Sequence, residues 1–317
     1  MMKLINKIIV SVFLLLMLPP MSHSAVKVFA VKSSEIEPYN RAIRGAKAAF
    51  TTARLAEDSI TVFGLEGDEV KWKEILKKVR EERPHLIMTF GTFATELAKR
   101  DVKDVPIVFS TVLNPEESRI VESLGPHNGN VTGASLDVPF ETQFSYILRI
   151  VPHASKIGVL YNPKETGGLV ERARAAALKM GLNLVTEAVV DESSLPRAIH
   201  RLMGKIDVLW SVADSTVFSS PAVYEIIIEA IDRKIPFMGL SPSFVRAGAL
   251  FSIKWDDTDI GRQAGETAIK VISMSENVSE IPVSTPRDIS LSINLRTAKA
   301  IGITIPEKVL KRAEVFK

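Results

Sequence analysis

The sequence predicts an α/β fold in which two Rossmann-like lobes, each built on a parallel sheet, face one another across a ligand cleft. Three observations lead to this prediction. Short apolar runs alternate with amphipathic helical stretches, a pattern typical of parallel strands covered by helices on both faces. A strand–helix–strand plan occurs twice along the chain, and the segments that follow the strands are rich in small polar residues.

The first 25 residues have the pattern of a secretory signal peptide. Lys3 and Lys7 form a basic head, and an apolar run over residues 8–18 follows them. This run is shorter than the roughly 20 residues that span a bilayer, which disfavours the alternative of an uncleaved anchor helix. We therefore expect cleavage between Ser22 and Ala25 and an exported mature chain.

The composition of the mature chain excludes several classes of protein. Its formal charge falls from +3 to +1, because the predicted signal holds two lysines and no acidic residue. A nearly neutral chain gives no reason to expect a nucleic acid or an anionic membrane surface as partner. The chain has no cysteine, which excludes disulfides, thiol catalysis and a lipid-modified N-terminal cysteine.

The apolar pattern assigns the secondary structure in chain order. Buried strands are expected over residues 26–31, 86–90, 107–109, 157–161, 208–212 and 237–240. Helices are expected over residues 39–53, 69–82, 167–180 and 222–232. Trp72, Trp210 and Trp255 are interpreted as core residues, with a ligand platform as the alternative role for Trp210. Asp256, Asp257 and Asp259 are interpreted as the cap and first turn of a helix that begins near Thr258, because a calcium loop needs more ligands at alternate positions.

An internal repeat relates the two halves of the chain. Residues 84–112 and 206–243 each contain an apolar strand, a small polar loop, a helix and then a proline before a second apolar strand. Ligands of open parallel sheets bind beyond the carboxyl ends of the strands. The expected ligand-facing loops are therefore residues 32–37, 91–95, 110–115, 161–167, 213–219 and 241–244. Their hydroxyl and N–H groups suit a carboxylate or another small polar group.

Sequence patterns of catalysis are missing from the chain. No two histidines are three or four residues apart, and neither a Gly-x-Ser-x-Gly elbow nor a phosphate-binding glycine loop occurs. We expect no enzyme activity, no cofactor and no metal. Helix capping is an alternative role for the loop residues Thr92, Asp214 and Ser215, because Thr, Asp and Ser cap many helices.

Several strings, in order from about residue 26 to the C-terminus, resemble one family. They are FGTFATELA, VPIVFSTVLNP, GPHNGNVTGAS, KIGVLYNPKE, KIPFMGL and INLRTAKAIGITIPEKVLKRAEVF. The resemblance is to exported substrate-binding proteins of ABC transporters, in the branch often associated with aromatic amino acids. It implies a periplasmic-binding-protein type I fold. The N-terminal lobe would hold residues 26–138 plus about 253–280, and the C-terminal lobe residues 139–252 plus about 281–317.

Matching motifs imply which residues face the ligand. From the first lobe these are Gly91, Thr92, Thr95, Ser110, Thr111 and Asn114, and from the second Tyr161, Asn162, Asp214 and Ser215. The polar loops add Ser33, Ser34 and Ser241. The chain departs from the family in two of these loops. It has VKSSEIEPYN where many relatives have a His-Pro segment, and Asn114 where many have Asp.

The expected function is that of the periplasmic solute-binding component of an ABC importer. A monomer would capture an amino acid or a similar zwitterion by hinge closure, with Asp214 as the counter-charge for an ammonium group, and would deliver it to a permease. Purines, nucleosides and sugars remain alternative ligands. A sensing subunit for a receptor kinase and an exported enzyme remain alternative functions.

Overall fold

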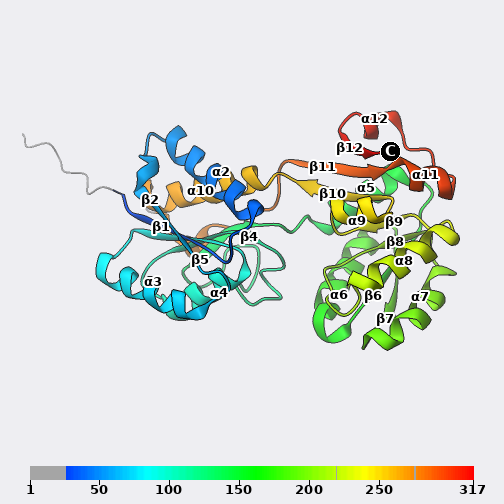
Figure 1. Ribbon diagram of the computed structural model, residues 1–317, viewed down its shortest axis with the longest axis horizontal. Coiled ribbons are helices and arrows are strands. Elements are labelled where there is room, and N and C mark those ends of the chain that lie inside the picture. Colours follow the sequence, from blue (N-terminus) through cyan, green and yellow to red (C-terminus); the bar gives the residue numbers. More distant parts are fainter. Residues whose placement is uncertain (1–25, 219, 275) are drawn as a thin grey trace, which may run out of the picture.

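Two separate β-sheets organise the protein into two lobes, which lie at opposite ends of its long axis (Figure 1). The computed structural model describes residues 26–218, 220–274 and 276–317. The predicted signal peptide, residues 1–25, lies outside the described residues. The α/β architecture with two sheets dominated by parallel strands confirms the predicted fold class.

The N-terminal lobe has a five-stranded parallel sheet in the order β2-β1-β3-β4-β5. Its strands are β1 (Val28–Lys32), β2 (Ile60–Gly64), β3 (Leu86–Phe90), β4 (Ile107–Val112) and β5 (Val131–Ser135). Its helices are α2 (Glu37–Thr52), α3 (Glu69–Glu82), α4 (Thr92–Asp101) and α10 (Asp257–Ser273), with short 3-10 turns η1 (Glu57–Ser59) and η3 (Val278–Glu280). Apolar residues of α2 and α10 fill one core and those of α3 and α4 fill another, so the helices cover both faces of the sheet.

The C-terminal lobe has a seven-stranded sheet in the order β12-β11-β10-β9-β8-β6-β7. Its strands are β6 (Lys156–Tyr161), β7 (Asn183–Ala188), β8 (Val208–Trp210), β9 (Phe237–Gly239), β10 (Phe251–Trp255), β11 (Ile289–Asn294) and β12 (Ala313–Phe316). Its helices are α5 (Phe140–Ile150), α6 (Pro163–Lys179), α7 (Leu195–Met203), α8 (Ser220–Asp232), α9 (Pro242–Ala247), α11 (Leu295–Ile301) and α12 (Glu307–Leu310), with the 3-10 turn η2 (Glu192–Ser194). Only the β10–β11 pair is antiparallel among the described strand pairs.

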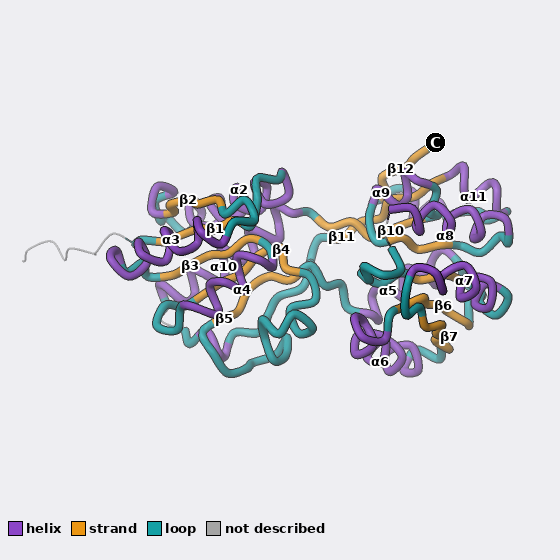
Figure 2. The backbone as a smooth tube through the Cα atoms, turned by 60° about the horizontal axis from the view of Figure 1, so that its bottom comes forward, coloured by secondary structure: helices purple, strands orange, loops and turns teal. Residues whose placement is uncertain are grey.

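The chain passes between the lobes three times, along the narrow middle of the molecule (Figure 2). The first crossing links β5 to α5, and the second links β10 to α10. The third links residue Ser284, which still bridges Ala134 of the N-terminal lobe, to β11. The lobe boundaries near residues 253 and 281 stay predictions from the sequence.

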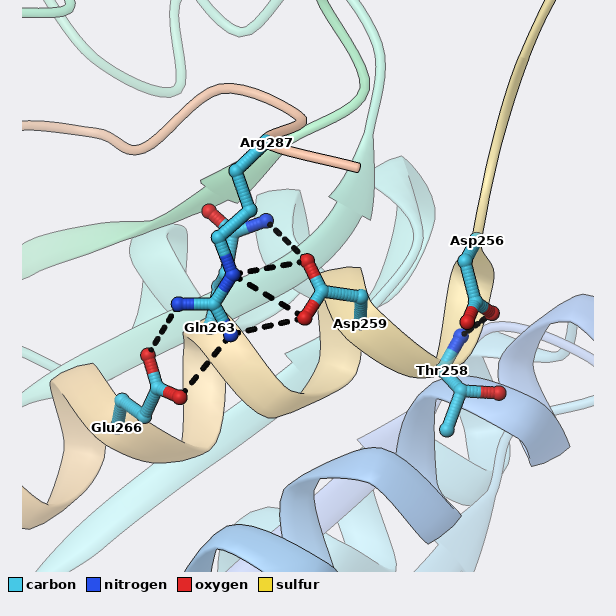
Figure 3. Close-up of polar contacts among 6 residues, drawn as sticks. All are labelled: Asp256, Thr258, Asp259, Gln263, Glu266 and Arg287. Carbon is cyan, nitrogen blue, oxygen red and sulfur yellow. Dashed lines mark hydrogen bonds and ion pairs between the residues drawn. The ribbon is translucent and has the colours of Figure 1, made fainter. Parts of the chain in front are cut away.

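After the second crossing, the chain re-enters the N-terminal lobe as helix α10. It lies so close to α2 that a Cβ atom at Gly261 would be 1.8 Å from the carbonyl oxygen of Ala42. Asp256 accepts a hydrogen bond from the N–H of Thr258, as expected of an N-cap. Figure 3 shows Arg287, from the third crossing, between Asp259 and Glu266 of α10, with ion pairs of 2.8 Å to each. Asp256 is thus the cap of α10, and Asp257 and Asp259 lie in its first turn, as interpreted from the sequence.

The predicted strands and helices match elements of the structure, with shifts at their ends. The strand over 86–90 and the helix over 69–82 have the predicted bounds. Trp72 and Trp210 are core residues, as predicted. The region after β8 differs, because β8 ends at Trp210 and α8 begins only at Ser220. Asp214 therefore opens an isolated turn and does not cap a helix, which was its alternative role, and the N–H of Phe218 closes this turn on the Asp214 carbonyl.

Candidate functional site

The sequence-predicted site residues form one group in each lobe, at or just beyond the carboxyl ends of strands. Ser33 and Ser34 follow β1, and Gly91, Thr92 and Thr95 follow β3. Ser110 and Thr111 end β4, with Asn114 just beyond it. Tyr161 ends β6 before Asn162, whereas Asp214 and Ser215 follow β8 and Ser241 follows β9. In open parallel sheets, ligands bind beyond this end of the strands.

In the N-terminal lobe, Ser33 ties the end of β1 to the start of α4. Its hydroxyl donates to the carbonyl of Phe90 and accepts from the N–H of Ala94, both at 3.0 Å. Gly91, between these elements, has φ +92°, and a Cβ there would lie 2.3 Å from the hydroxyl of Tyr39. Only glycine satisfies both constraints. The hydroxyl of Tyr39 is thus a further polar group beside Gly91, one that the sequence analysis did not name.

The hydroxyl of Thr95 is used within the lobe. It is buried, donates to the carbonyl of Gly91 at 2.8 Å and lies 2.8 Å from the hydroxyl of Thr89. The hydroxyl of Ser110 is also buried, but it has no hydrogen-bond partner within the described ranges. Such a group costs about 1–3 kcal/mol unless a water or a ligand pairs with it.

The end of β4 has an unusual backbone. Thr111 and Asn114 have φ values of +57° and +50°, the left-handed region that residues with a Cβ rarely adopt. The N–H of Asn114 donates to Asp137 of the first crossing at 2.8 Å. Backbone strain of this kind persists where the surrounding structure holds it, and it clusters at binding and catalytic sites.

In the C-terminal lobe, Asp214 is the centre of a saturated hydrogen-bond network. Its Oδ1 accepts from the N–H groups of Thr216 and Val217, both at 3.1 Å. Its Oδ2 accepts from the N–H of Asn162 at 2.7 Å and from the hydroxyl of Thr166 at 2.6 Å. A carboxylate has about four acceptor positions. Asp214 is only 2% exposed, so the acceptor positions of its carboxylate are occupied by donors of the protein itself.

Glu165, in the first turn of α6, is a second carboxylate at the same edge. Its Oε1 accepts the N–H of Ser215 at 2.7 Å, and its Oε2 accepts the Ser215 hydroxyl at 2.9 Å. The sequence analysis placed Glu165 in the expected ligand-facing loop 161–167 but did not single it out. A signal was present, because Asn162 followed three residues later by Glu resembles a capping box, and Asn162 is indeed the N-cap of α6.

A cavity of about 720 Å³ lies between the lobes beside the crossings. Its walls are largely apolar and include Phe140, Leu169, Trp210, Met238, Ile253 and Trp255. The indole N–H of Trp210 donates to Gln143, so this ring is held in one orientation. Of the thirteen sequence-predicted residues, only Asn114 lines this cavity. Ser241 also lies apart from both networks and contacts the hydroxyl of Ser243 at 3.1 Å.

Charged residues surround one side of this cavity and connect the lobes. Arg172 of α6 forms ion pairs with Glu117 and, at 3.5 Å, with Glu116, both in the loop after β4. Asp137 is half-buried beside them. Burial raises the pKa of Asp137 to about 6, against hydrogen bonds from Asn114 and Ser135, and the nearby Glu117 and Glu116 add to the rise.

Between residues 26 and 317, apart from 219 and 275, no group of three or more His, Cys, Asp or Glu side chains could hold a metal ion. Within the same ranges, no helix combines the length and the hydropathy that crossing a bilayer requires.

Known proteins are similar over most of the chain. The family model for ABC transporter substrate binding proteins matches residues 42–317. A tyrosine-binding protein of Clostridioides difficile (strain R20291) is 31% identical over 233 residues, which are 73% of this chain and 67% of that protein. These matches confirm the resemblance predicted from the sequence.

Two solved structures with 25% identity share the fold. The ligand-free, open form of a substrate binding protein with adhesive properties from Clostridium difficile has a TM-score of 0.78, with 92% of this chain and 99% of that chain covered. The ABC domain from Streptococcus pneumonia in complex with L-Trp has a TM-score of 0.65, with the same coverage. The chain belongs to the family of ABC transporter substrate-binding proteins, a family of binding proteins rather than of enzymes.

Proposed function

We propose that the protein binds an aromatic amino acid between its lobes and delivers it to an ABC permease. The observation that carries this proposal is the cavity of about 720 Å³, which both lobes line. Its size is within the range of about 300–1,000 Å³ that is typical of small-molecule sites. Phe140 and Trp255, which are partly exposed, offer flat apolar surfaces against which an aromatic ring can pack. The tyrosine-binding relative and the L-Trp-bound structure support this ligand class.

The polar groups at the strand ends are suited to the charged part of such a ligand. Hydroxyl and N–H groups at the end of β4 and around Asn162 and Ser215 lie at the edges of the two sheets. A ligand that contacts both edges stabilises the arrangement in which they approach one another, so binding favours closure about the three crossings. The higher TM-score with the ligand-free, open structure supports an open starting state.

Calorimetry and small-angle scattering on the purified mature protein test the proposal. We expect saturable binding of L-tyrosine, L-tryptophan or L-phenylalanine, with a smaller radius of gyration in the complex. At a ligand concentration of about one hundred times Kd, folding should be stabilised by about 2.7 kcal/mol. Binding of a sugar or a nucleoside, with no binding of these amino acids, would refute the ligand class. An unchanged radius of gyration in the complex would refute closure.

The proposed location is the periplasm, after cleavage between Ser22 and Ala25, and the proposed state is a monomer. N-terminal sequencing of protein from a native periplasmic fraction tests the first point. A chain that still begins at Met1 or Met2 and sediments with membranes would contradict it. Light scattering tests the second point, and a dimer would contradict it.

A further inference from the structure

The carboxylate that meets a ligand's ammonium group must have an accessible oxygen with a free acceptor position. Asp214, the acidic residue that the sequence singled out, fails both conditions, because it is 2% exposed and accepts four hydrogen bonds from the protein. Three of its donors are backbone N–H groups, which cannot turn away to admit a cation. Asp214 therefore holds the loop after β8 against the start of α6.

Glu165 meets both conditions at the same edge. Glu165 is exposed, and each of its carboxylate oxygens accepts one hydrogen bond from Ser215. The hydroxyl of Thr216 lies farther away, at 3.5 Å from Oε2. A carboxylate has about four acceptor positions, so Glu165 retains capacity for a further donor.

Glu165 also lacks a competing cation. Among the described residues, no Lys, Arg or His nitrogen lies within ion-pair distance of its carboxylate. Its two bonds to Ser215 fix the carboxylate in place before any ligand arrives, which reduces the entropy cost of binding. Figure 1 shows α6 on the side of the C-terminal lobe that is nearest the N-terminal lobe.

We propose that Glu165, held by Ser215, is the specificity-determining carboxylate that binds the ammonium group of the ligand. This inference rests on the proposed function, because it presupposes an amino-acid ligand. It assigns the negative charge to α6 and leaves Asp214 with a positioning role.

Glu165→Gln is a suitable probe because it removes the charge and can preserve the geometry. The amide oxygen can accept the N–H of Ser215, and the amide nitrogen can donate to the Ser215 hydroxyl, which accepts as readily as it donates. Glu171→Gln is the matched control. Glu171 lies six residues farther along the same helix, is exposed and pairs only with Arg174 among the described residues.

The experiment compares L-tyrosine with 3-(4-hydroxyphenyl)propionate, which lacks the ammonium group, by calorimetry on the full mature chain. We expect the wild type and Glu171→Gln to prefer L-tyrosine by about ten- to hundredfold, the usual effect of one charge-assisted hydrogen bond. We expect Glu165→Gln to bind L-tyrosine about ten- to hundredfold more weakly and to lose most of this preference. L-Tryptophan and 3-(indol-3-yl)propionate form a second pair, for use if tryptophan binds more tightly.

The possible results separate the inference from the proposed function. If the wild type binds an aromatic amino acid and Glu165→Gln retains the full preference for the ammonium group, the inference is wrong and the proposed function stands. If the wild type binds none of the aromatic amino acids, the proposed function fails and the inference fails with it. Thermal melts of both variants, which should match the wild type within about 2 °C, exclude misfolding as the cause of a loss.

Discussion

Replacing Asp214 by asparagine tests whether this residue holds the C-terminal lobe together. An asparagine oxygen in the place of Oδ1 can still accept from Thr216 and Val217. The amide nitrogen then takes the place of Oδ2 and faces the N–H of Asn162, which is also a donor. The hydroxyl of Thr166 can rotate and accept instead. The variant therefore loses one bond to a charged acceptor and leaves one N–H unpaired.

The structure sets the size of this effect. A hydrogen bond to a charged group contributes about 1.5–3 kcal/mol, and an unpaired buried donor costs about 1–3 kcal/mol. Because the two terms describe partly the same loss, we expect a destabilisation of about 2–4 kcal/mol. With about 2–4 °C per kcal/mol for a domain of 150–250 residues, Tm should fall by about 5–15 °C.

Thermal unfolding followed by circular dichroism measures this fall, and Asp191→Asn is its control. Asp191 is an exposed N-cap of η2, where asparagine serves nearly as well as aspartate. Its replacement should change Tm by less than about 2 °C. A change equally small for Asp214→Asn would refute the hydrogen-bond argument, and it would reopen the possibility that the Asp214 carboxylate is free to bind a ligand.

Two further predictions concern the region between the lobes. Arg172→Gln removes the ion pairs with Glu116 and Glu117, which join the lobes in the arrangement that we propose to be the open one. Partly exposed ion pairs contribute up to about 1 kcal/mol, so the ligand affinity of Arg172→Gln should rise by up to about fivefold at low salt. The gain should vanish in 0.5 M salt, where these charges are screened. Weaker ligand binding by the variant would contradict this prediction. Asp137 has a pKa of about 6 in the folded protein, above the ordinary 3.8, so the folded protein holds the carboxyl proton more tightly than the unfolded chain does. The stability that the protonated carboxyl contributes is therefore lost as the pH rises from about 4 to about 6. Asp137→Asn should therefore be more stable than the wild type at pH 7 and equal to it near pH 4, and Tm differences that do not depend on pH would contradict the assignment.

The positions of most strands and helices near the site could be predicted because local patterns determine them. The continuous apolar run at 86–90 and the helical spacing at 69–82 were predicted with the bounds of β3 and α3. The capping role of Asp256 also depends only on its neighbour Thr258. The strands β2, β5, β7, β10, β11 and β12 were not predicted, because polar residues interrupt their apolar runs.

The candidate site could be predicted only in part. The rule that ligand-binding loops follow parallel strands located both polar groups, and it named Ser215 and Asn162. It could not show which of the carboxylates, Asp214 or Glu165, keeps a free acceptor position. The donors that occupy Asp214 include Asn162 and Thr166, which lie 52 and 48 positions away in the chain.

By itself, the sequence determined the α/β class and the two-lobe plan, because periodicity and strand–helix order are properties of consecutive residues, and the resemblance of its motifs to known proteins indicated the family. Only the tertiary structure decided which carboxylate is enclosed, which charges join the lobes and which side chains line the cavity. Arg172 meets Glu117, and Trp210 meets Gln143, across 55 and 67 positions of chain. Such contacts follow from the order of the strands and the places where the chain crosses between lobes, and neither leaves a periodic pattern in the sequence.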